Sequence, residues 1–276
     1  MSSKLWLTCF FTGLFSSVLA QPGSGFKNLG EIKGKFTYMK PDLLGNIYAL
    51  GSSGQLKKFN PSLDSMGVFT EVKRFGQLHH IIADNPLKTL LYFKAYKTIL
   101  VLDRFMQVVN RIDLRRLNIF QANAMAQSYD GKIWLYDEQE ANLKKLSDNG
   151  KVELETADLR LALGWNPAPQ VIVELDQLVC LYDQSNGLLL FDQLGGYRNT
   201  IPLKGWQSVH AVGSFVVGLS NGMLMAYDPK KLEMKQLADL SSWHWQESQQ
   251  VMVSGQRLYI MDNEGIKVLG IPMSGS

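Results

Sequence analysis

The stretch Leu188-Leu189-Leu190-Phe191-Asp192 decides the fold, because close variants of it return along the whole chain. Each copy begins with an apolar residue, has a large apolar residue in fourth place and ends at a turn. The other copies are residues 56–60, 99–103, 143–147, 224–228 and 266–270. Their fourth residues lie at positions 59, 102, 146, 191, 227 and 269, which gives spacings of 43, 44, 45, 36 and 42 residues. The chain after residue 34 therefore consists of six repeats of one unit.

Each repeat contains strand and turn signals and little else. The first repeat has four short strand-like stretches separated by turn residues, at 36–40, 46–50, 55–59 and 68–73. In the third repeat, Asp130-Gly131 supplies a tight turn before a strand of alternating large residues. A period of about 40–45 residues with four strands in each repeat is typical of a β-propeller blade. We predict an all-β fold, a six-bladed β-propeller of four-stranded blades.

The two ends of the chain predict how this ring closes. The sixth repeat is one strand short, because only residues 272–276 follow its last strand at 266–271. A spare strand-like stretch at 26–33 precedes the first repeat. We expect this N-terminal strand to complete the last blade, which leaves no open seam in the ring. No helix signal of useful length is present, and the run 159–163 is long enough for a single turn.

The first twenty residues have the pattern of a targeting segment. Lys4 precedes an apolar run at 5–18, and residues 18–20 form a small-x-small cleavage site. The run is too short to span a membrane comfortably. We expect residues 1–20 to be a signal peptide and residues 21–276 to be one propeller domain without a transmembrane anchor. The mature protein is then exported, to the periplasm in a host with two membranes and otherwise to the medium.

The composition argues against nucleic-acid binding and against a disulfide framework. Removing Lys4 with the targeting segment lowers the net charge from +3 to +2, which is no strong attractive field for nucleic acid. Arg111, Arg115 and Arg116 form the densest basic group, which we interpret as a solvated loop. Cys180 is then the only cysteine, so no intrachain disulfide is possible, and its apolar strand context predicts that the thiol is buried.

The repeated motifs resemble those of known propellers. An Asp-Gly-x-apolar-aromatic strand at 130–134 and a Gly-x-Leu-x-x-Phe stretch at 54–59 resemble the broad superfamily of NHL-, YWTD- and PQQ-like propellers over nearly the whole mature chain. The Gly-His and Trp-Asp pair of WD40 repeats and the docking repeat of quinoprotein dehydrogenases are missing, so the resemblance implies no quinone cofactor. More loosely, the chain is similar to exported propellers of Bacteroidota-type bacteria, a likeness that brings no established activity.

The predicted inner strands offer few groups for a metal or a cofactor. These strands lie at 36–40, 79–84, 122–128, 170–175, 209–213 and 250–255. Their acid or amide candidates are Asp84, Asn123 and Glu174, and the first two fall at opposite ends of their strands, so the oxygens do not converge on a cation. No nucleophile elbow or phosphate loop is present. We predict no metal site, no cofactor and no catalytic residue, and leave open whether the protein is an enzyme.

Three histidines stand near the starts of inner strands. His79 and His80 belong to the second repeat and His210 to the fifth, which lie opposite each other in a ring of six. A pair across the channel mouth could bind a metal or act as acid and base. The alternative is that these rings point into blade interfaces or into solvent, and the absence of neighbouring ligand residues favours it.

Large aromatic residues recur just before the inner strands. They are Phe75, Phe120, Trp165, Trp206 and Trp245, at spacings of 45, 45, 41 and 39 residues, with Trp243 beside the last. By repeat geometry they lie on one face of the ring, around the channel mouth. They either form an exposed binding face, since Trp and Phe are enriched at protein interfaces and sugar platforms, or act as wedges packed between blades.

These observations favour an interaction module over an enzyme. We predict an exported, non-enzymatic scaffold that binds an envelope protein partner, as a periplasmic subunit of an envelope or outer-membrane assembly. One alternative is a carbohydrate-binding propeller that holds a glycan on the same tryptophans. Another is a hydrolase or lyase with its site at the channel mouth.

Overall fold

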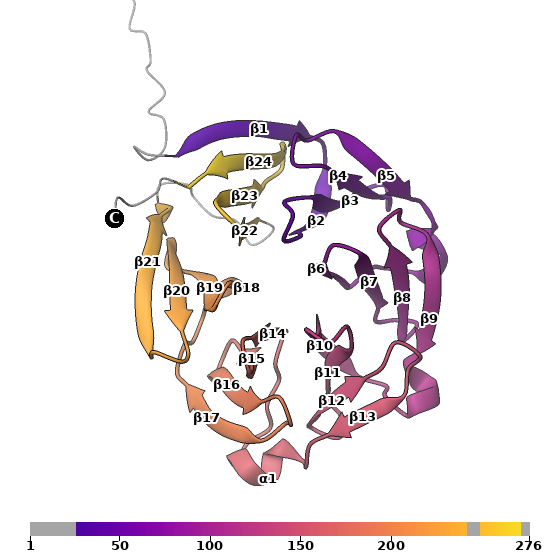
Figure 1. The fold of residues 1–276 in the computed structure, drawn as a ribbon, viewed down its shortest axis with the longest axis vertical. Helices are drawn as coiled ribbons and strands as arrows, with labels where there is room; N and C mark the ends of the chain where they lie inside the picture. Colours follow the sequence, from indigo (N-terminus) through magenta and orange to yellow (C-terminus); the bar gives the residue numbers. More distant parts are fainter. Residues whose placement is uncertain (1–25, 242–248, 272–276) are drawn as a thin grey trace, which may run out of the picture.

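The computed structural model describes residues 26–241 and 249–271. In these residues six antiparallel sheets of four strands each stand around a central axis and form a six-bladed β-propeller (Figure 1). In each blade, strand A is innermost, strands B and C follow, and strand D forms the outer edge. The predicted all-β, six-bladed fold is confirmed. The expectations for residues 1–20, Trp243 and Trp245 lie outside the described residues.

The first three blades follow one another along the chain, each in the order A to D. Blade 1 comprises β2 (Phe36–Pro41), β3 (Ile47–Gly51), β4 (Leu56–Phe59) and β5 (Ser65–Phe69). Blade 2 comprises β6 (His80–Asn85), β7 (Lys88–Phe93), β8 (Thr98–Asp103) and β9 (Val108–Asp113). Blade 3 comprises β10 (Ala122–Gln127), β11 (Ile133–Asp137), β12 (Asn142–Leu146) and β13 (Val152–Glu155).

The last three blades complete the ring. Blade 4 comprises β14 (Val171–Leu175), β15 (Leu178–Asp183), β16 (Gly187–Asp192) and β17 (Tyr197–Ile201). Blade 5 comprises β18 (Gln207–Val212), β19 (Phe215–Ser220), β20 (Met223–Asp228) and β21 (Glu233–Asp239). Blade 6 comprises β22 (Gln250–Ser254), β23 (Arg257–Met261), β24 (Gly265–Gly270) and β1 (Lys27–Lys33). In the part of the chain that the structure describes, three short helices join blades, namely the 3-10 helices η1 (Glu71–Phe75) and η2 (Leu114–Leu117) and the α-helix α1 (Leu159–Leu163).

The last residue of the repeated stretch holds the turn between strands C and D. Asp103 Oδ1 accepts hydrogen bonds from the backbone N–H groups of Phe105 and Gln107, both at 2.9 Å. Asn60 and Asp192 hold the corresponding turns of blades 1 and 4 in the same way. Side chains of this type stabilise turns because they imitate a backbone acceptor. The last residue of the repeated stretch therefore marks the end of strand C and holds the turn that leads into strand D.

The hydrophobic core lies between neighbouring blades. At the first interface Tyr48 and Leu56 of blade 1 pack with Leu91 and Leu100 of blade 2, and all four are fully buried. Comparable clusters occupy the other interfaces. Because burying a side chain such as Leu stabilises a fold by about 1.5–3 kcal/mol, the stability of the ring is distributed over these interfaces and is lost where one of them opens.

Strand β1 closes the ring from the opposite end of the chain (Figure 1). It pairs antiparallel with β24, with Lys27 opposite Gly270 and Lys33 opposite Gly265. Ile32 of β1 is buried in the cluster shared by blades 6 and 1. Gly265 allows this approach, because a Cβ atom there would lie 2.1 Å from the carbonyl oxygen of Ile32. The closure predicted from the stretch 26–33 is confirmed.

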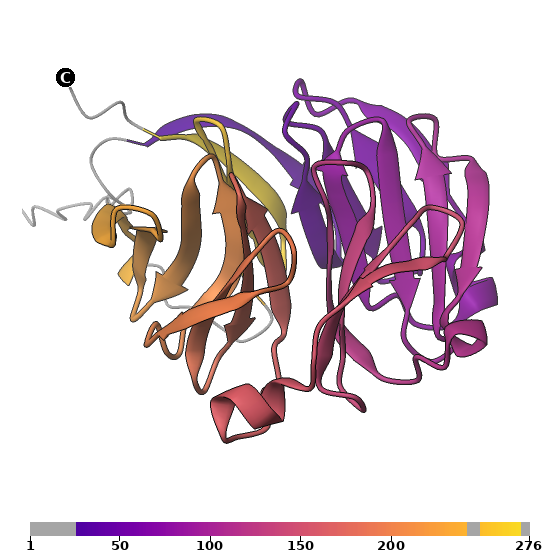
Figure 2. The same cartoon turned by 60° about the horizontal axis from the view of Figure 1, so that its bottom comes forward.

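The alternation of strands gives the ring two faces. The A–B and C–D turns lie at one end, which we call the AB face. The B–C turns and the D–A connections lie at the other end, the DA face. The helices η1, η2 and α1 belong to D–A connections, and Figure 2 shows them at the same end of the ring. The single helical turn predicted at 159–163 is α1.

The predicted strand at 68–73 is wrong in its bounds. Strand β5 ends at Phe69, and residues 71–75 form η1 instead. The pairing shows why, since Phe69 lies opposite Leu56, the first residue of β4. Beyond this point strand C offers no further backbone partner, so the chain leaves the sheet.

Removing the closing strand should destabilise the whole ring. We expect deletion of residues 26–33 to remove about 5 kcal/mol of stability, which lowers the unfolding midpoint by roughly 10–20 °C for a domain of this size. Calorimetry of the mature chain and the deleted chain measures this. A synthetic peptide of residues 26–33 should restore the midpoint when added in trans, and a scrambled peptide should not. An unchanged midpoint in the deleted chain would contradict the role of β1.

Candidate functional site

His210 is a structural link between blades 5 and 6. Its Nε2 atom accepts a hydrogen bond from the backbone N–H of Val253 at 2.9 Å, so the ring proton must lie on Nδ1, which donates to the carbonyl oxygen of Ser208 at 2.6 Å. The side chain is buried, and this burial lowers the pKa of His210 to about 4. With both nitrogens bonded to backbone, His210 has no free atom for a metal or a substrate.

His80 has a similar role between blades 2 and 3. Its Nε2 atom contacts the carbonyl oxygen of Asn123, and burial lowers the pKa of the imidazole. His79 lies beside it, with ring centroids 4.4 Å apart, and its own pKa falls to about 4 through partial burial and the neighbouring cationic groups. The contacts of His80 run to blade 3 and those of His210 to blade 6. The structure therefore does not join them into the acid–base pair considered from sequence.

A small polar cluster surrounds His79 at the DA end of the channel. Lys94 Nζ donates to Oδ1 of Asn123, and Glu138 follows strand B of blade 3 nearby, where burial raises the pKa of its carboxyl. The hydroxyl of Tyr92 is buried without a hydrogen-bond partner in the described part of the chain. This cluster combines neutral imidazoles with one ammonium group. A base with a pKa near 4 is a weak proton acceptor at neutral pH, so His79 is poorly suited to general base catalysis.

The three predicted acid and amide side chains serve separate neighbours. Asp84 forms a salt bridge of 3.0 Å with Lys40 across blades 1 and 2. Glu174 accepts hydrogen bonds from Ser128 Oγ at 3.1 Å and from the backbone of Tyr129 at 2.8 Å. Within residues 26–241 and 249–271, no group of three His, Cys, Asp or Glu side chains is arranged to hold a metal ion.

The predicted aromatic face is not uniformly exposed. Trp206 is 5% exposed and lies in the core between blades 4 and 5. Its backbone N–H donates to the Tyr182 hydroxyl at 2.6 Å, and that hydroxyl bonds back to its carbonyl oxygen at 3.1 Å. A Cβ atom on Gly218 would come within 2.7 Å of the Trp206 ring, so the glycine makes room for it. Trp206 therefore has the wedge role of the two alternatives and is not available to a partner.

The other aromatic residues of this set differ from one another. Trp165 is partly buried against the core between blades 3 and 4. Phe75 is also partly buried, with its ring 5.4 Å from that of Phe93. Phe120 is exposed at 42%. The binding face stays a prediction for Phe120, and Trp243 and Trp245 lie outside the described residues.

Exposed large apolar side chains gather instead on the AB face. Leu43, Leu44, Leu87 and Tyr129 come from the A–B turns of blades 1 to 3 and are 63–74% exposed. The C–D turns of the same face add Phe105, Leu194 and Leu232. The DA face exposes only Tyr96, Phe120 and Leu161 among the described residues. The repeat pattern did not single out these leucines, because they lie in turns outside the repeated strands.

Cys180 matches its prediction. The thiol is buried in strand B of blade 4 and unpaired, and burial raises its pKa to about 12. A thiol of this type stays protonated and unreactive at neutral pH.

Comparison with known proteins places the chain by fold. No protein-family model and no curated protein matches the sequence. Among solved structures, virginiamycin B lyase from Staphylococcus aureus is similar with a TM-score of 0.65 at 10% identity, over 89% of this chain and 99% of that one. The likeness confirms the six-bladed propeller and, at this identity, shows nothing beyond it.

Two further similar structures come from larger proteins. PorZ, a bacterial surface component of the type-IX secretion system of Porphyromonas gingivalis, has a TM-score of 0.52 at 13% identity, over 90% of this chain and 34% of that one. The extracellular domain of a hybrid two-component system from B. thetaiotaomicron has a TM-score of 0.56 at 14% identity, over 87% and 34%. Both likenesses are again to the fold. In the described residues, no helix is both long and apolar enough to cross a membrane.

Truncation of Trp206 should destabilise the fold. We expect Trp206→Ala to cost about 3–5 kcal/mol, as for other buried aromatic residues, and Phe120→Ala to cost less than about 1 kcal/mol because its ring is largely in solvent. Urea unfolding of both variants measures the difference. Equal, small losses would show that Trp206 does not carry the packing described above.

His210 should make stability depend on pH. The unfolded imidazole takes up a proton near pH 6.5 and the folded one only near pH 4, so stability falls as the pH drops between these values, by about 3 kcal/mol. Urea unfolding of the wild type and of His210→Gln between pH 7 and pH 4 isolates this contribution, because His79 is present in both proteins and cancels. The same pH slope in both would argue against a buried neutral His210.

Proposed function

We propose that the protein is an exported, non-enzymatic β-propeller that acts as a protein–protein interaction scaffold. In a host with two membranes it would be a periplasmic subunit of an envelope or outer-membrane assembly. The observation that carries this proposal is the group of exposed apolar side chains on the AB face. This group comes from three consecutive blades and lies mostly in solvent; it consists of Leu43, Leu44, Leu87 and Tyr129.

Such a group is best explained by a partner that covers it. Exposed apolar side chains that gather on one face mark interaction sites, because burial against a partner removes them from water. The turns that carry these residues are held rigidly; Asp42, for example, accepts hydrogen bonds from the backbone of Leu44 and Asn46 at 2.9 and 2.8 Å. A rigid surface loses little conformational entropy on binding, which favours affinity.

The side chains of the channel also favour a scaffold over an enzyme. His80 and His210 bond to backbone groups, and Asp84 and Glu174 bond to neighbouring blades. The residues best equipped for chemistry are thus engaged in holding the ring together. Export is supported by the targeting pattern of residues 1–20 and agrees with the surface role stated for PorZ.

The alternatives rest on weaker geometry. A carbohydrate-binding role needs exposed tryptophans, whereas Trp206 is buried and Trp165 is partly so. A hydrolase or lyase is favoured by one observation, the His79 imidazole, which is partly exposed beside Lys94 and forms no hydrogen bond among the described residues. Its lowered pKa makes it a weak base, so we rank this activity below the scaffold.

Substitutions on the two faces should separate binding from folding. We expect the triple variant Leu43→Ser, Leu44→Ser and Leu87→Ser to lose its partner, because the apolar contact is replaced by hydroxyl groups that prefer water. The unfolding midpoint should change by only a few degrees, since surface changes of this kind are usually within about 0.5 kcal/mol each. Affinity capture from gently crosslinked envelopes, followed by mass spectrometry, measures partner recovery.

The matched control changes the opposite face. The triple variant Tyr96→Ser, Phe120→Ser and Leu161→Ser removes the same number of exposed apolar side chains and should retain the partner. Loss of the partner only in this control would transfer the binding site to the DA face, where the aromatic prediction placed it. A wild-type protein that is recovered alone would contradict the scaffold proposal.

A further inference from the structure

A groove runs along the outer rim between blades 1 and 2. It has a volume of about 420 Å³ and extends from η1 at the DA end to the C–D turn of blade 2 at the AB end. The buried residues Phe69, Leu100 and Met106 lie beneath it. Its accessible lining is the partly buried Phe75 together with Thr70, Glu71, Arg74, Gln107, Val108 and Arg111. A groove with this extent and mixed lining suits an extended chain that carries both polar and apolar side chains.

Arginines stand on the rim of this groove. The guanidinium carbons of Arg74 and Arg111 lie 5.9 and 5.4 Å from the centre of the Phe75 ring. Arg74 also reaches Glu71 at 3.4 Å, whereas Arg111 forms no salt bridge among the described residues. An arginine stacked on an aromatic ring is held in place by the cation–π attraction and still presents its N–H groups to an incoming carboxylate.

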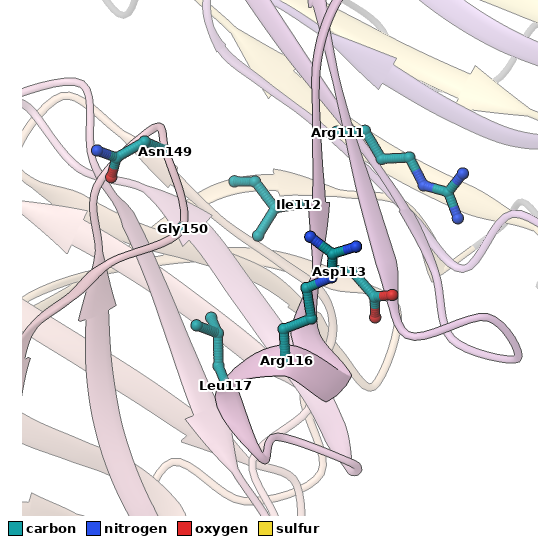
Figure 3. Close-up of a pocket in the computed structure, with 7 residues that line it drawn as sticks. All are labelled: Arg111, Ile112, Asp113, Arg116, Leu117, Asn149 and Gly150. Carbon is teal, nitrogen blue, oxygen red and sulfur yellow. The ribbon is translucent and has the colours of Figure 1, made fainter.

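A second groove continues on the other side of strand β9. It has a volume of about 430 Å³ and is lined by Arg111, Ile112, Asp113, Arg116, Leu117, Asn149 and Gly150. Figure 3 shows Ile112 and Leu117 facing the loop at Gly150, with Arg111 on the opposite side of the strand. Arg115 forms a salt bridge of 2.7 Å with Asp113, whereas Arg116 forms none within the described chain and only helps to lower the pKa of the Asp113 carboxyl. Both grooves therefore combine apolar residues with an arginine that forms no salt bridge.

The charge of the whole chain is concentrated in this sector. Residues 65–117, from β5 to the end of η2, contain nine Lys or Arg and four Asp or Glu, a net charge of +5. The complete sequence has a net charge of +3, so the remaining residues sum to −2. Lys94 and Asp84 of this stretch lie at the channel, and Lys88 is paired with Asp148. The other seven basic and three acidic side chains still give a net charge of +4, which the interpretation as a solvated loop did not recognise. A positive surface steers acidic partners and favours their binding.

Strand β9, which separates the grooves, is also an edge strand, and its charged residues are Arg111 and Asp113 in its second half. It is the last strand of its sheet, and Val108 and Val109 are 45% and 60% exposed. Strand β5 on the other side of the first groove exposes Met66 at 63% and Val68 at 45% and contains no charged residue. Natural proteins normally protect outer strands with charges. Apolar edges beside unpaired arginines fit an acidic strand that also carries apolar side chains.

We propose that the rim of blades 1 and 2 binds an extended acidic peptide segment of a partner protein. The apolar side chains of the segment pack against Phe75 and the exposed Val108, and its carboxylates pair with Arg74, Arg111 and Arg116. The inference builds on the scaffold function and adds the chemistry of a second docking surface. It is distinct from the leucine group of the AB face, because it shares no residue with that group.

Peptide binding to the full mature protein tests the proposal. The probe is a short fluorescein-labelled peptide of alternating Glu and Leu or Phe residues, and its binding is followed by fluorescence anisotropy at low and physiological salt. We expect the double variant Arg74→Glu and Arg111→Glu to weaken binding by roughly tenfold or more, because attraction is replaced by repulsion at two sites. Both side chains are exposed, so the unfolding midpoint should stay within a few degrees of the wild type.

Matched controls define the outcome. The double variant Lys204→Glu and Lys231→Glu changes the net charge equally at exposed positions outside this sector and should bind the peptide like the wild type. A peptide with Ser in place of Leu and Phe should bind much more weakly. Equal losses in both charge variants, equal binding of the Ser peptide, or tighter binding of anionic vesicles or single-stranded DNA would overturn the assignment.

The AB-face variant distinguishes this proposal from the scaffold function. Leu43→Ser, Leu44→Ser and Leu87→Ser should leave peptide binding unchanged, because the substitutions lie away from the grooves. If the wild type captures its envelope partner but does not bind the peptide, the groove proposal fails and the scaffold stands. If the peptide binds but no envelope partner is recovered, the scaffold proposal fails while the groove remains a peptide site.

Discussion

The pairing of β1 with β24 is the constraint on which the rest of the structure depends. Each blade is apolar on both faces, so it can bury them only between two neighbours. Without β1, blade 6 would lack its outer strand, and Ile32 would be missing from the cluster that also contains Met39 and Ile47 of blade 1. The channel wall and the rim grooves are formed by residues of different blades, so both exist only while the ring is closed.

Ring closure also explains why the channel histidines, which the sequence offered as candidate functional residues, have structural roles. Positions about one repeat apart meet across each blade interface, as His210 meets Val253 and His80 meets Asn123, both at a separation of 43 residues. The inner strands run side by side without forming a common sheet, so polar side chains supply the bonds between them. A buried polar group without such a partner would cost about 1–3 kcal/mol. Polar residues at the channel are therefore retained by the fold itself.

The parts of the fold that could be predicted from sequence are those encoded within one repeat. The spacing of Phe191 and its equivalents set the blade count, and the stretch 159–163 showed its helical turn. The parts that could not be predicted depend on distant neighbours. The burial of Trp206 requires Gly218 and Tyr182 around it, and the end of β5 is set by its partner Leu56. The basic rim could not be recognised from the net charge of the chain, because the +5 of residues 65–117 is partly cancelled by the −2 of the remaining residues.

A binding function is favoured by the contrast between polar residues that hold the blades together and surface residues that do not. Most of the histidines and carboxylates of the channel are bonded to neighbouring blades, so changing them alters the fold along with any activity. The leucines of the AB face are largely in solvent, and Arg111 and Arg116 form no salt bridge in the described chain, although Arg111 lies over the Phe75 ring. Such residues are free to serve recognition, because their cost to folding is small. This division, with most polar channel residues holding the blades together and apolar and arginine side chains left at the surface, favours the proposed scaffold role over catalysis.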